Sequence, residues 1–486
     1  MNPGFEAIIG LEVHVQLRTR SKMFCACRNV YGAAPNTHTC PVCLGLPGAL
    51  PALNGEAVRM ALVLGLAVGA RIREDSTFYR KQYFYPDLPK GYQITQGPVA
   101  LVEGGDLEIL GDPGVRGAAG PVRIRLERAH LEEDAGKSTH DLRPGASLVD
   151  LNRAGVPLLE VVGAPDLRSP QEASDFLKTL HRLVVFLGIC DGNLEEGSFR
   201  CDANVSLRRV GDAAFGTRVE VKNLNSFRFV KQALAYEIGR QAHLLEGGGT
   251  VRLETRGWDA QTGETRSQRS KEAAMDYRYF PEPDLPVLQI GPEEVAAARA
   301  ALPELPEAKA RRWEGAFGLG VDEAQTLLQS PAFTAYFEAL AAACGQGKAA
   351  ANWMLGEVSR TLNERGHGIE TFPVPPENLA ELIRLVESRQ IGLGAARDQV
   401  FPALLAGEGT AGAIVAAKGL AQVSDRGAIE ALVAGVLAAN PGPVAQIRAG
   451  KEGLKGFLVG QVLKAGGGRV DPKLANEVLA EALVKA

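Results

Sequence analysis

The sequence predicts an α+β protein in which a domain built on an antiparallel sheet precedes two helical domains. Residues 1–292 contain short stretches of alternating apolar and polar residues, separated by Gly and Pro turns, and such stretches are typical of strands. After the segment 277–286 (YRYFPEPDLP), alanine- and glutamate-rich stretches such as EEVAAARAAL indicate helices. From about Phe401 aromatic residues nearly vanish and helices of small residues follow. We therefore expect three domains, 1–292, 293–400 and 401–486.

Composition and charge limit the class of protein. The chain has 486 residues, 45% of them hydrophobic, which is enough for about two to four ordinary cores. Its longest apolar run, Met60–Ala70, is too short to span a bilayer, and the start of the chain lacks a basic segment followed by an apolar one. We therefore expect no membrane partner and a cytoplasmic location. The net charge is −4, so a nucleic acid would have to bind through local basic patches.

Four cysteines near the start form two couplets, Cys25-x-Cys27 and Cys40-x-x-Cys43. Four thiols at this spacing are typical of a tetrahedral zinc site, and the run CPVCLG has the form of a zinc knuckle. Disulfides are the alternative, but a chain of this size needs no such staples and shows no secretory signal. Four thiolates leave no open coordination position, so we expect a structural zinc and look for the chemistry elsewhere.

Three predicted strands of the first domain each have one apolar face and one face of polar groups. The polar faces comprise Glu12, His14 and Gln16 in GLEVHVQL, Asp202, Asn204, Ser206 and Arg208 in CDANVSLR, and Arg218, Glu220 and Lys222 in TRVEVKN. A Gly-bounded loop, RVGDAAFG, joins the last two segments, so they should pair as an antiparallel hairpin. Ser206 and Asn204 should then lie roughly across from Glu220 and Lys222.

These faces hold the donors of a divalent-metal site, because they mix carboxylates and an amide with an imidazole. For one strand alone, a solvated outer face explains the pattern equally well, but three strands favour a site. The run HLEEDAGK adds Glu132, Glu133 and Asp134, whose mutual repulsion a bound Mg²⁺ would relieve, although an exposed acidic turn is the alternative. Mg²⁺ shares its ligands with phosphate oxygens, so we expect nucleotide chemistry.

The commonest phosphate-binding loop is not recognisable in the sequence. The run AGKS at Ala135–Ser138 ends like one, but Leu131 stands where its first glycine belongs. We expect instead that metal ions bridge carboxylates to ATP on an antiparallel sheet and that basic side chains stabilise the transferred phosphoryl group. The basic candidates are Arg80, Lys81, Lys90, Lys137, Arg153, Arg200 and Lys222.

Several long motifs together resemble the B subunit of the tRNA-dependent amidotransferase. In chain order they are GLEVHVQL, YFYPDLPKGYQITQ, HLEEDAGK, VDLNRAGVPLLEVV, EEGSFRCDANVS, VEVKNLNSF, TRGWD and DYRYFPEPDLP, and GLKGFLVGQVLKAGGG matches the family's tail. The resemblance implies an enzyme component that uses ATP to phosphorylate the side-chain carboxylate of misacylated Glu-tRNA(Gln), and often Asp-tRNA(Asn). Ammonia from an amidase partner, the A subunit, then displaces the phosphate, and a small C subunit joins the two.

The resemblance also implies a fold and a set of site residues. The fold would be a cradle related to that of glutamine synthetase, followed by a helical domain and a tail domain that grips tRNA, and some members carry zinc in the cradle. The implied Mg²⁺ ligands are Glu12, His14, Glu133, Asp202 and Glu220. Besides Glu12, His14 and Glu133 we count Lys81 and Lys222 as catalytic, and we count Arg80, Lys137, Arg200, Asn204 and Ser206 as ATP-binding. The family pattern has Asp and Asn where this chain has Tyr79 and Gln82. This difference affects the contacts expected for that loop more than it affects the metal site.

The tail contains a local excess of basic residues. Between Pro441 and Lys473 these are Arg448, Lys451, Lys455, Lys464, Arg469 and Lys473, against two acidic residues. By itself such a stretch is more often a solvated helix face, but the resemblance favours phosphate contacts with tRNA.

Two other classes of function remain open from the sequence. One is a free-standing ATP-dependent ligase that acts on a small amino acid and needs no RNA-binding tail. The other is a zinc-stabilised, tRNA-binding scaffold without catalysis, in which the polar strand faces only contact phosphates. The sequence does not fix whether Glu-tRNA(Gln), Asp-tRNA(Asn) or both are substrates.

Overall fold

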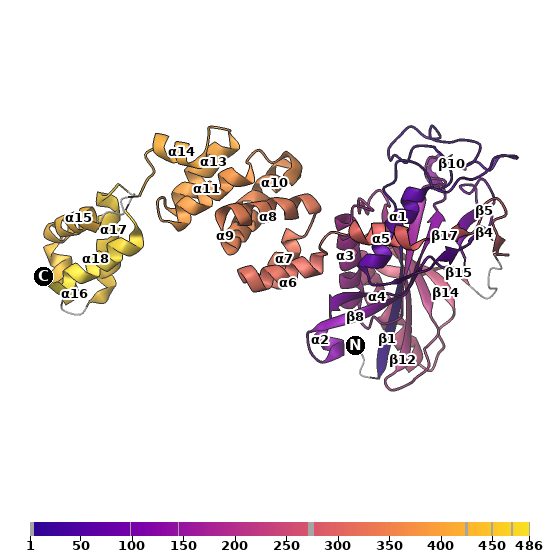
Figure 1. Ribbon diagram of the computed structural model, residues 1–486. Coiled ribbons are helices and arrows are strands. Elements are labelled where there is room, and N and C mark those ends of the chain that lie inside the picture. The colour runs from indigo at the N-terminus through magenta and orange to yellow at the C-terminus, as the bar shows by residue number, and fades with distance from the viewer. Residues whose placement is uncertain are drawn as a thin grey trace. The chain divides into compact units, whose positions relative to one another are not determined.

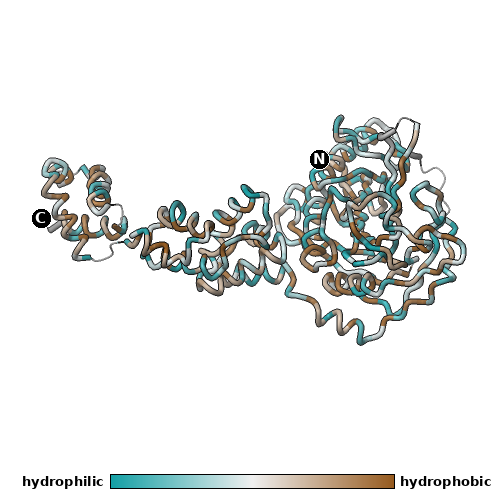
Figure 2. The backbone as a smooth tube through the Cα atoms, turned by 90° about the horizontal axis from the view of Figure 1, so that it is seen from above, coloured by the Kyte–Doolittle hydropathy of each residue, from teal (hydrophilic) through white to brown (hydrophobic). Residues whose placement is uncertain are grey.

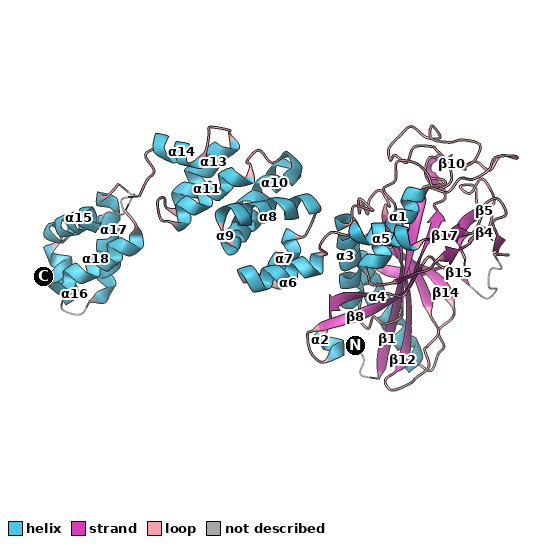
Figure 3. Cartoon of the chain, in the orientation of Figure 1, coloured by secondary structure: helices cyan, strands magenta, loops and turns pink. Residues whose placement is uncertain are grey.

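The computed structural model describes residues 4–97, 99–143, 145–270, 277–422, 426–448, 451–467 and 470–485. The chain forms two compact units, Met1–Pro306 and Glu307–Ala486 (Figure 1). Among the described residues, the strands lie in the first unit and the second unit is helical (Figure 3). The α+β class with an all-helical C-terminal region is therefore confirmed, whereas the predicted boundaries at 292 and 400 stay predictions.

The strands of the first unit, in chain order, are β1 (Phe5–Gln16), β2 (Arg71–Ile72), β3 (Asp75–Ser76), β4 (Phe78–Gln82), β5 (Tyr92–Gln96), β6 (Val102–Glu103), β7 (Asp106–Leu110), β8 (Pro121–Glu133), β9 (Lys137–Arg143), β10 (Ala146–Asp150), β11 (Pro157–Gly163), β12 (Phe199–Arg209), β13 (Val219–Lys222), β14 (Glu254–Asp259), β15 (Glu264–Ser270), β16 (Phe280–Pro281) and β17 (Leu288–Gln289). Its helices are α1 (Gly55–Ala67), α2 (Pro113–Arg116), α3 (Pro170–Phe186), α4 (Phe227–Glu246) and α5 (Pro292–Ala300).

The main path of the large sheet runs in the order β15-β14-β13-β12-β1-β11-β8-β5-β4-β16. The predicted hairpin is confirmed, because β12 and β13 pair antiparallel with Asn204 opposite Glu220. The expectation of a purely antiparallel sheet is corrected: β13 and β14 run parallel, since helix α4 connects them and returns the chain to the same end of the sheet. The sheet is therefore mixed.

The apolar face of this sheet forms the core of the first unit. Along β1, Leu11, Val13 and Val15 are at most 1% exposed, in alternation with the half-buried polar residues. Helices α3 and α4 pack on each other, and α4 packs on β12 (Figure 1). Helix α3 begins after Ser169, whose hydroxyl accepts a hydrogen bond from the Glu172 backbone N–H. With these helices on the apolar face, the opposite face of the central strands carries the polar groups.

The helices of the second unit are α6 (Pro306–Phe317), α7 (Val321–Leu327), α8 (Pro331–Cys344), α9 (Gly347–Trp353), α10 (Ser359–Arg365), α11 (Pro376–Glu387), α12 (Leu393–Ala395), α13 (Phe401–Leu405), α14 (Ala411–Ala417), α15 (Arg426–Ala439), α16 (Pro441–Arg448), α17 (Lys455–Ala465) and α18 (Pro472–Lys485), with π-helical turns at Met354–Val358 and Ala396–Val400 and 3₁₀ turns at Ile369–Thr371 and Glu452–Leu454.

Hydrophobic and hydrophilic stretches alternate along the helices of this unit (Figure 2). Helices α15, α17 and α18 contact one another around a hydrophobic cluster of their own, which includes Val433, Leu458 and Leu479. Within the described ranges, no one helix combines the length and apolar character needed to cross a membrane. One pair of helices that meet at a bend, Arg426–Ala439 and Pro441–Ile447, passes the test of length and composition when the two are taken together.

Helix α5 follows the segment at which the sequence predicts a domain boundary, yet it packs on α1. Its Ala298 is 3% exposed and belongs to the core cluster of the first unit. Leu302 and Leu305, further along the chain, also pack against that cluster. The first unit therefore extends to residue 306.

Candidate active site

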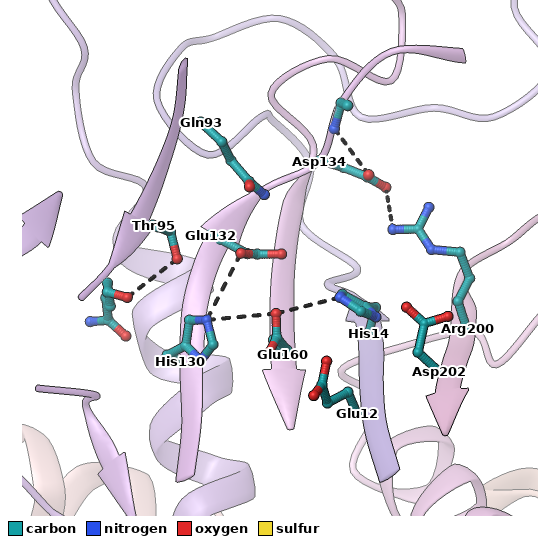
Figure 4. A network of polar contacts seen from close by, with 12 residues as sticks. Glu12, His14, Gln93, Thr95, His130, Glu132, Asp134, Glu160, Arg200 and Asp202 are labelled. Carbon is teal, nitrogen blue, oxygen red and sulfur yellow. Dashed lines mark hydrogen bonds and ion pairs between the residues drawn. The ribbon is translucent and has the colours of Figure 1, made fainter. Parts of the chain in front are cut away.

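The candidate site lies on the polar face of the four central strands. In the register of β12, β1, β11 and β8, Arg200 is opposite His14, His14 is opposite Glu160, and Glu160 is opposite His130. One row of charged and imidazole side chains thus crosses the sheet (Figure 4). Antiparallel pairing places directly opposite side chains on the same face about 5 Å apart, so this row is set by the backbone.

His14, Glu132 and Glu160 form the tightest group of possible metal ligands. Their ligand atoms all lie within 4.8 Å of one another, and His14 Nε2 lies 3.4 Å from Glu160 Oε2. His130 Nε2 lies 3.8 Å from a carboxylate oxygen of both Glu132 and Glu160. Two carboxylates and an imidazole suit a divalent cation such as Mg²⁺ or Mn²⁺.

The electrostatics of this group favour a bound cation. Burial, reinforced by the charge of Glu160, raises the pKa of Glu132 to about 7. Burial opposes the charged form of His14, but its hydrogen bond with Glu160 and the neighbouring carboxylates raise the pKa of His14 overall. Burial lowers the pKa of His130 to about 4, so this imidazole is neutral at pH 7. Burial opposes the charged form of Glu160 as well, but its hydrogen bond with His14 lowers its pKa overall. Glu132, whose charge is destabilised by burial and by Glu160, is therefore the carboxylate that gains most from a cation.

A second acidic group adjoins the first on β1, β12 and β13. Burial, then the charges of Glu160, Glu220 and Asp202, raises the pKa of Glu12. Asn204 Nδ2 donates a hydrogen bond to Glu12 Oε1 at 2.9 Å. Lys222 Nζ lies 2.5 Å from Asp202 Oδ2 and 3.0 Å from Glu220 Oε1. The structure therefore brings Glu12, Asp202, Glu220 and Lys222 together, as predicted from the strand faces, with the lysine between two of the acids.

Glu160 is a site residue that the sequence reasoning missed. It is the only polar residue of β11, PLLEVVG, whose other side chains are buried. A lone carboxylate among buried apolar side chains is costly unless it is paired or binds an ion. The single carboxylate in this apolar strand can be read from the sequence, but the strands that pair with β11 cannot.

The structure separates Glu133 from the other implied Mg²⁺ ligands. Because successive side chains of a strand point to opposite faces, Glu132 faces the cluster and Glu133 faces away from it. Glu133 pairs with Lys90 and accepts a hydrogen bond from the backbone N–H of Ile94 at 2.9 Å. It also lines a small pocket with Cys25 and Cys43. Glu133 and Lys90 therefore form a buried ion pair under the cysteine loop.

The predicted basic residues fall in different surroundings. Burial opposes the charged form of Lys81, but the nearby carboxylate of Glu132 raises its pKa, so this amine beside the cluster stays protonated. Arg80 instead forms a fork with Glu282, at 2.7 and 2.8 Å. Arg200 pairs with Asp134 at 3.0 Å.

Two spaces flank the cluster. An open cleft of about 470 Å³ is lined by Glu12, Asn204 and Ser206, with Gly10 and Gly163 on adjoining strands. A wider cavity of about 700 Å³ is lined by Arg200, Lys137 and Arg153. Of the residues predicted to bind ATP, Asn204 and Ser206 line the cleft and Lys137 and Arg200 line the cavity, whereas Arg80 lines neither. The AGKS run begins in the connection after β8 and ends inside β9, so it leads into a strand rather than into the helix of a phosphate loop.

The four cysteines lie together in the loop after β1. Their sulfur atoms are all within 4.8 Å of one another, and the Cys40 backbone N–H donates to Cys43 Sγ at 3.2 Å, as in a knuckle. The side chain of Lys22 is fully buried, and its ammonium group donates to His38 O, Leu151 O and Cys43 Sγ. A compact set of four sulfur donors fits zinc and leaves no position for a substrate.

Of the predicted basic residues of the tail, Lys451, Lys464 and Lys473 are exposed. Arg469 and the side chain of Arg448 lie outside the described residues.

Comparison with known proteins identifies the class of protein first. Residues 7–296 match the family model of the GatB/GatE catalytic domain, and residues 335–483 match that of the GatB domain. These matches define the chain as an amidotransferase component. Relatives named as the B subunit of aspartyl/glutamyl-tRNA(Asn/Gln) amidotransferase are 53% identical over 488 residues in Ralstonia nicotianae, 52% over 480 in Thioalkalivibrio sulfidiphilus and 51% over 482 in Geobacter sulfurreducens, each alignment covering 99% of both chains. The chain belongs to the family of the aspartyl/glutamyl-tRNA(Asn/Gln) amidotransferase B subunit.

Proposed function

We propose that this chain activates the side-chain carboxylate of misacylated Glu-tRNA(Gln) or Asp-tRNA(Asn) with ATP and then amidates it with ammonia from an amidase partner, with a small third polypeptide joining the two. The observation that carries the proposal is the convergence of His14, Glu132 and Glu160 beside the second acidic group and the open cleft. We also propose that the sheet resembles that of glutamine synthetase.

The ligand set we propose for Mg²⁺ is His14, Glu132 and Glu160, with Glu12, Asp202 and Glu220 available to a second ion. Bound there, Mg²⁺ would neutralise the phosphate oxygens and the substrate carboxylate. Asn204 and Ser206 place the nucleotide in the cleft, whose glycines leave room for it along the strands. Zinc, held by the four cysteines, is structural.

In each of the two steps, one bond forms at the reacting atom and another breaks. In the first, a carboxylate oxygen attacks the γ-phosphorus, the bond from that phosphorus to the bridging oxygen breaks, and ADP leaves with the electron pair. In the second, the lone pair of ammonia attacks the acyl carbon, phosphate leaves, and the new amide loses a proton. Activation is needed because a free carboxylate would have to expel oxide. Lys81 and Lys222 supply positive charge where the phosphoryl oxygens pass.

The proposal is tested with the full chain and its amidase partner, supplied with ATP, Mg²⁺, glutamine and each mischarged tRNA in turn. Amide and phosphate should appear in equal amounts, and ammonium chloride should replace glutamine. His14→Ala and Glu160→Gln should each lower the rate at least about a hundredfold, as expected for loss of charge stabilisation, whereas Glu56→Gln, at an exposed position of α1, should not.

Two results would favour the other classes of function. ATP hydrolysis stimulated by free glutamate or aspartate without tRNA would indicate a free-standing ligase. Unchanged amide formation in Glu12→Ala and Asp202→Ala would indicate a scaffold without catalysis.

A further inference from the structure

A cluster of aromatic side chains lies at one edge of the large sheet. We call Tyr83, Phe84, Tyr85, Tyr277, Tyr279 and Phe280 the aromatic surface. Phe84 is 83% exposed, Tyr85 55% and Tyr279 49%, whereas most large aromatic side chains of a folded protein are covered. Exposed rings gathered in one place mark a recognition surface.

Two segments far apart in the sequence build this surface. Strand β16 pairs with β4 with Phe280 opposite Arg80, and the backbone N–H of Gln82 donates to Tyr277 O at 2.9 Å. The rings of Tyr83 and Tyr277 are 6.2 Å apart, and those of Tyr277 and Tyr279 are 5.9 Å apart, each pair edge to face. The arrangement is therefore held by the backbone. Edge-to-face contacts leave ring faces free for a flat group.

Cations lie among the rings. Lys81 Nζ is 5.0 Å from the ring centre of Tyr277 and 5.9 Å from that of Tyr83. The Arg80 guanidinium lies 4.3 Å from the ring centre of Tyr92, but Glu282 and Asp284 neutralise it. Lys81 is thus the cation that connects the rings to the carboxylates of Glu132 and Glu160. Rings interleaved with cations are the chemistry that binds unpaired nucleotides, because every base has a face that can stack.

The aromatic surface also adjoins the metal-ligand group. Thr95 of β5 is opposite Glu132 of β8, and Tyr83 donates a hydrogen bond to Gln93 Oε1 at 3.3 Å on the same strand β5. Figure 4 shows Gln93 and Thr95 close to Glu132. A ligand stacked on these rings would therefore lie only a few side chains away from the metal-ligand group.

We propose that the aromatic surface binds the unpaired 3′ end of the tRNA by stacking its terminal bases, so that the esterified amino acid enters the cluster. This inference rests on the proposed function only in that the substrate carboxylate is carried by RNA. A second protein chain is the other conceivable occupant. The rings alternate with the half-buried ammonium group of Lys81 and lie next to the carboxylates of the metal-ligand group. This arrangement favours the RNA end.

The test compares the affinity of the full chain for intact, uncharged tRNA and for the same tRNA lacking its last four nucleotides, at one salt concentration. One stacked base contributes about 1–3 kcal/mol, so we expect the truncated RNA to bind at least about fivefold more weakly. Phe84→Leu and Tyr279→Leu should weaken binding of the intact RNA by a similar factor and leave binding of the truncated RNA unchanged. Tyr31→Leu removes an equally exposed ring on the cysteine loop and should change neither affinity.

Equal binding of the two RNAs by the unaltered chain would overturn the inference. So would a Phe84→Leu variant that loses amidase partner in co-purification but keeps its preference for the intact RNA. If these variants do not fold, intact tRNA with a photoreactive 4-thiouridine at its 3′ end decides: cross-links within 83–85 or 277–280 support the inference, and cross-links elsewhere overturn it. These measurements need no ATP, so a failure of amide formation would count against the proposed function alone.

Discussion

Glu132 and Glu133 are neighbours in the sequence, but they lie in opposite environments. Glu132 faces His14 and Glu160, whereas Glu133 faces Lys90 and the cysteine loop. The same charge is therefore destabilised by carboxylates at one position and stabilised by an ammonium group at the next. The same substitution should therefore have different consequences at the two positions.

We predict that Glu132→Gln loses Mn²⁺ binding at the cluster, while Glu133→Gln retains it. Glu133→Gln should instead cost about 3–5 kcal/mol of folding free energy, because Lys90 would be left buried without its partner. Titration of Mn²⁺ followed by electron paramagnetic resonance, together with thermal unfolding, measures both quantities. The reverse pattern would show that Glu133 is the ligand.

We also predict that the affinity for Mn²⁺ rises between pH 6 and pH 8. The pKa of Glu132 is raised to about 7 and that of His14 is raised above its usual 6.5, so a cation must displace protons from both below neutrality. The gain should be at least about tenfold per pH unit below pH 7 and should flatten above it. Isothermal titration in buffers of different ionisation enthalpy counts the released protons, and Glu132→Gln should release fewer.

The same shift acts on stability with a definite sign. Between pH 4.5 and about 7 the folded chain holds a proton on Glu132 that the unfolded chain has lost. This group therefore makes the metal-free chain less stable as the pH rises through that window, and Glu132→Gln should reduce that dependence.

At the scale of elements, the alternation along β1, β12 and β13 could be predicted from the sequence, since period-2 patterning is local. The register then placed Glu12 opposite Asp202 and Asn204 opposite Glu220. The position of β11 between β1 and β8 could not be predicted, because it depends on pairing between distant segments. That pairing is what brings Glu160 to His14. The choice of Glu133 came from the family resemblance, whereas alternation along β8 selects Glu132.

The cysteine loop should depend on its metal. We predict that zinc removal by a chelator lowers the thermal midpoint by roughly 5–10 °C and opens the chain to trypsin at the exposed Arg28, because the thiolates are what close the loop. Cys43→Ser should reproduce both effects without chelator. A reagent that counts accessible thiols should find four more after chelation, while the buried Cys190 and Cys201 stay protected. Unchanged cleavage after zinc removal would show that the loop is held by packing alone.

At the scale of the whole molecule, the second unit offers exposed lysines far along the chain from the candidate site. We predict that tRNA affinity falls as salt rises and that Lys464→Ala and Lys473→Ala each reduce the slope of log Kd against log salt by about one, since each phosphate contact releases about one counterion. Lys178→Ala, on α3 of the first unit, should leave the slope unchanged. Filter binding at several potassium chloride concentrations gives the slopes, and identical slopes in all variants would remove the tail lysines from the interface.

The packing of α5 on α1 has a practical consequence for dissecting the molecule. An expression plasmid that stops at residue 292, where the composition changes, would strip a covering helix and leave α1 with an apolar side in water, and the product would be prone to aggregate. Ending the fragment after Pro306 keeps α5, Leu302 and Leu305 in place. The choice between these two stop codons decides whether the candidate site can be studied on an isolated, well-behaved piece.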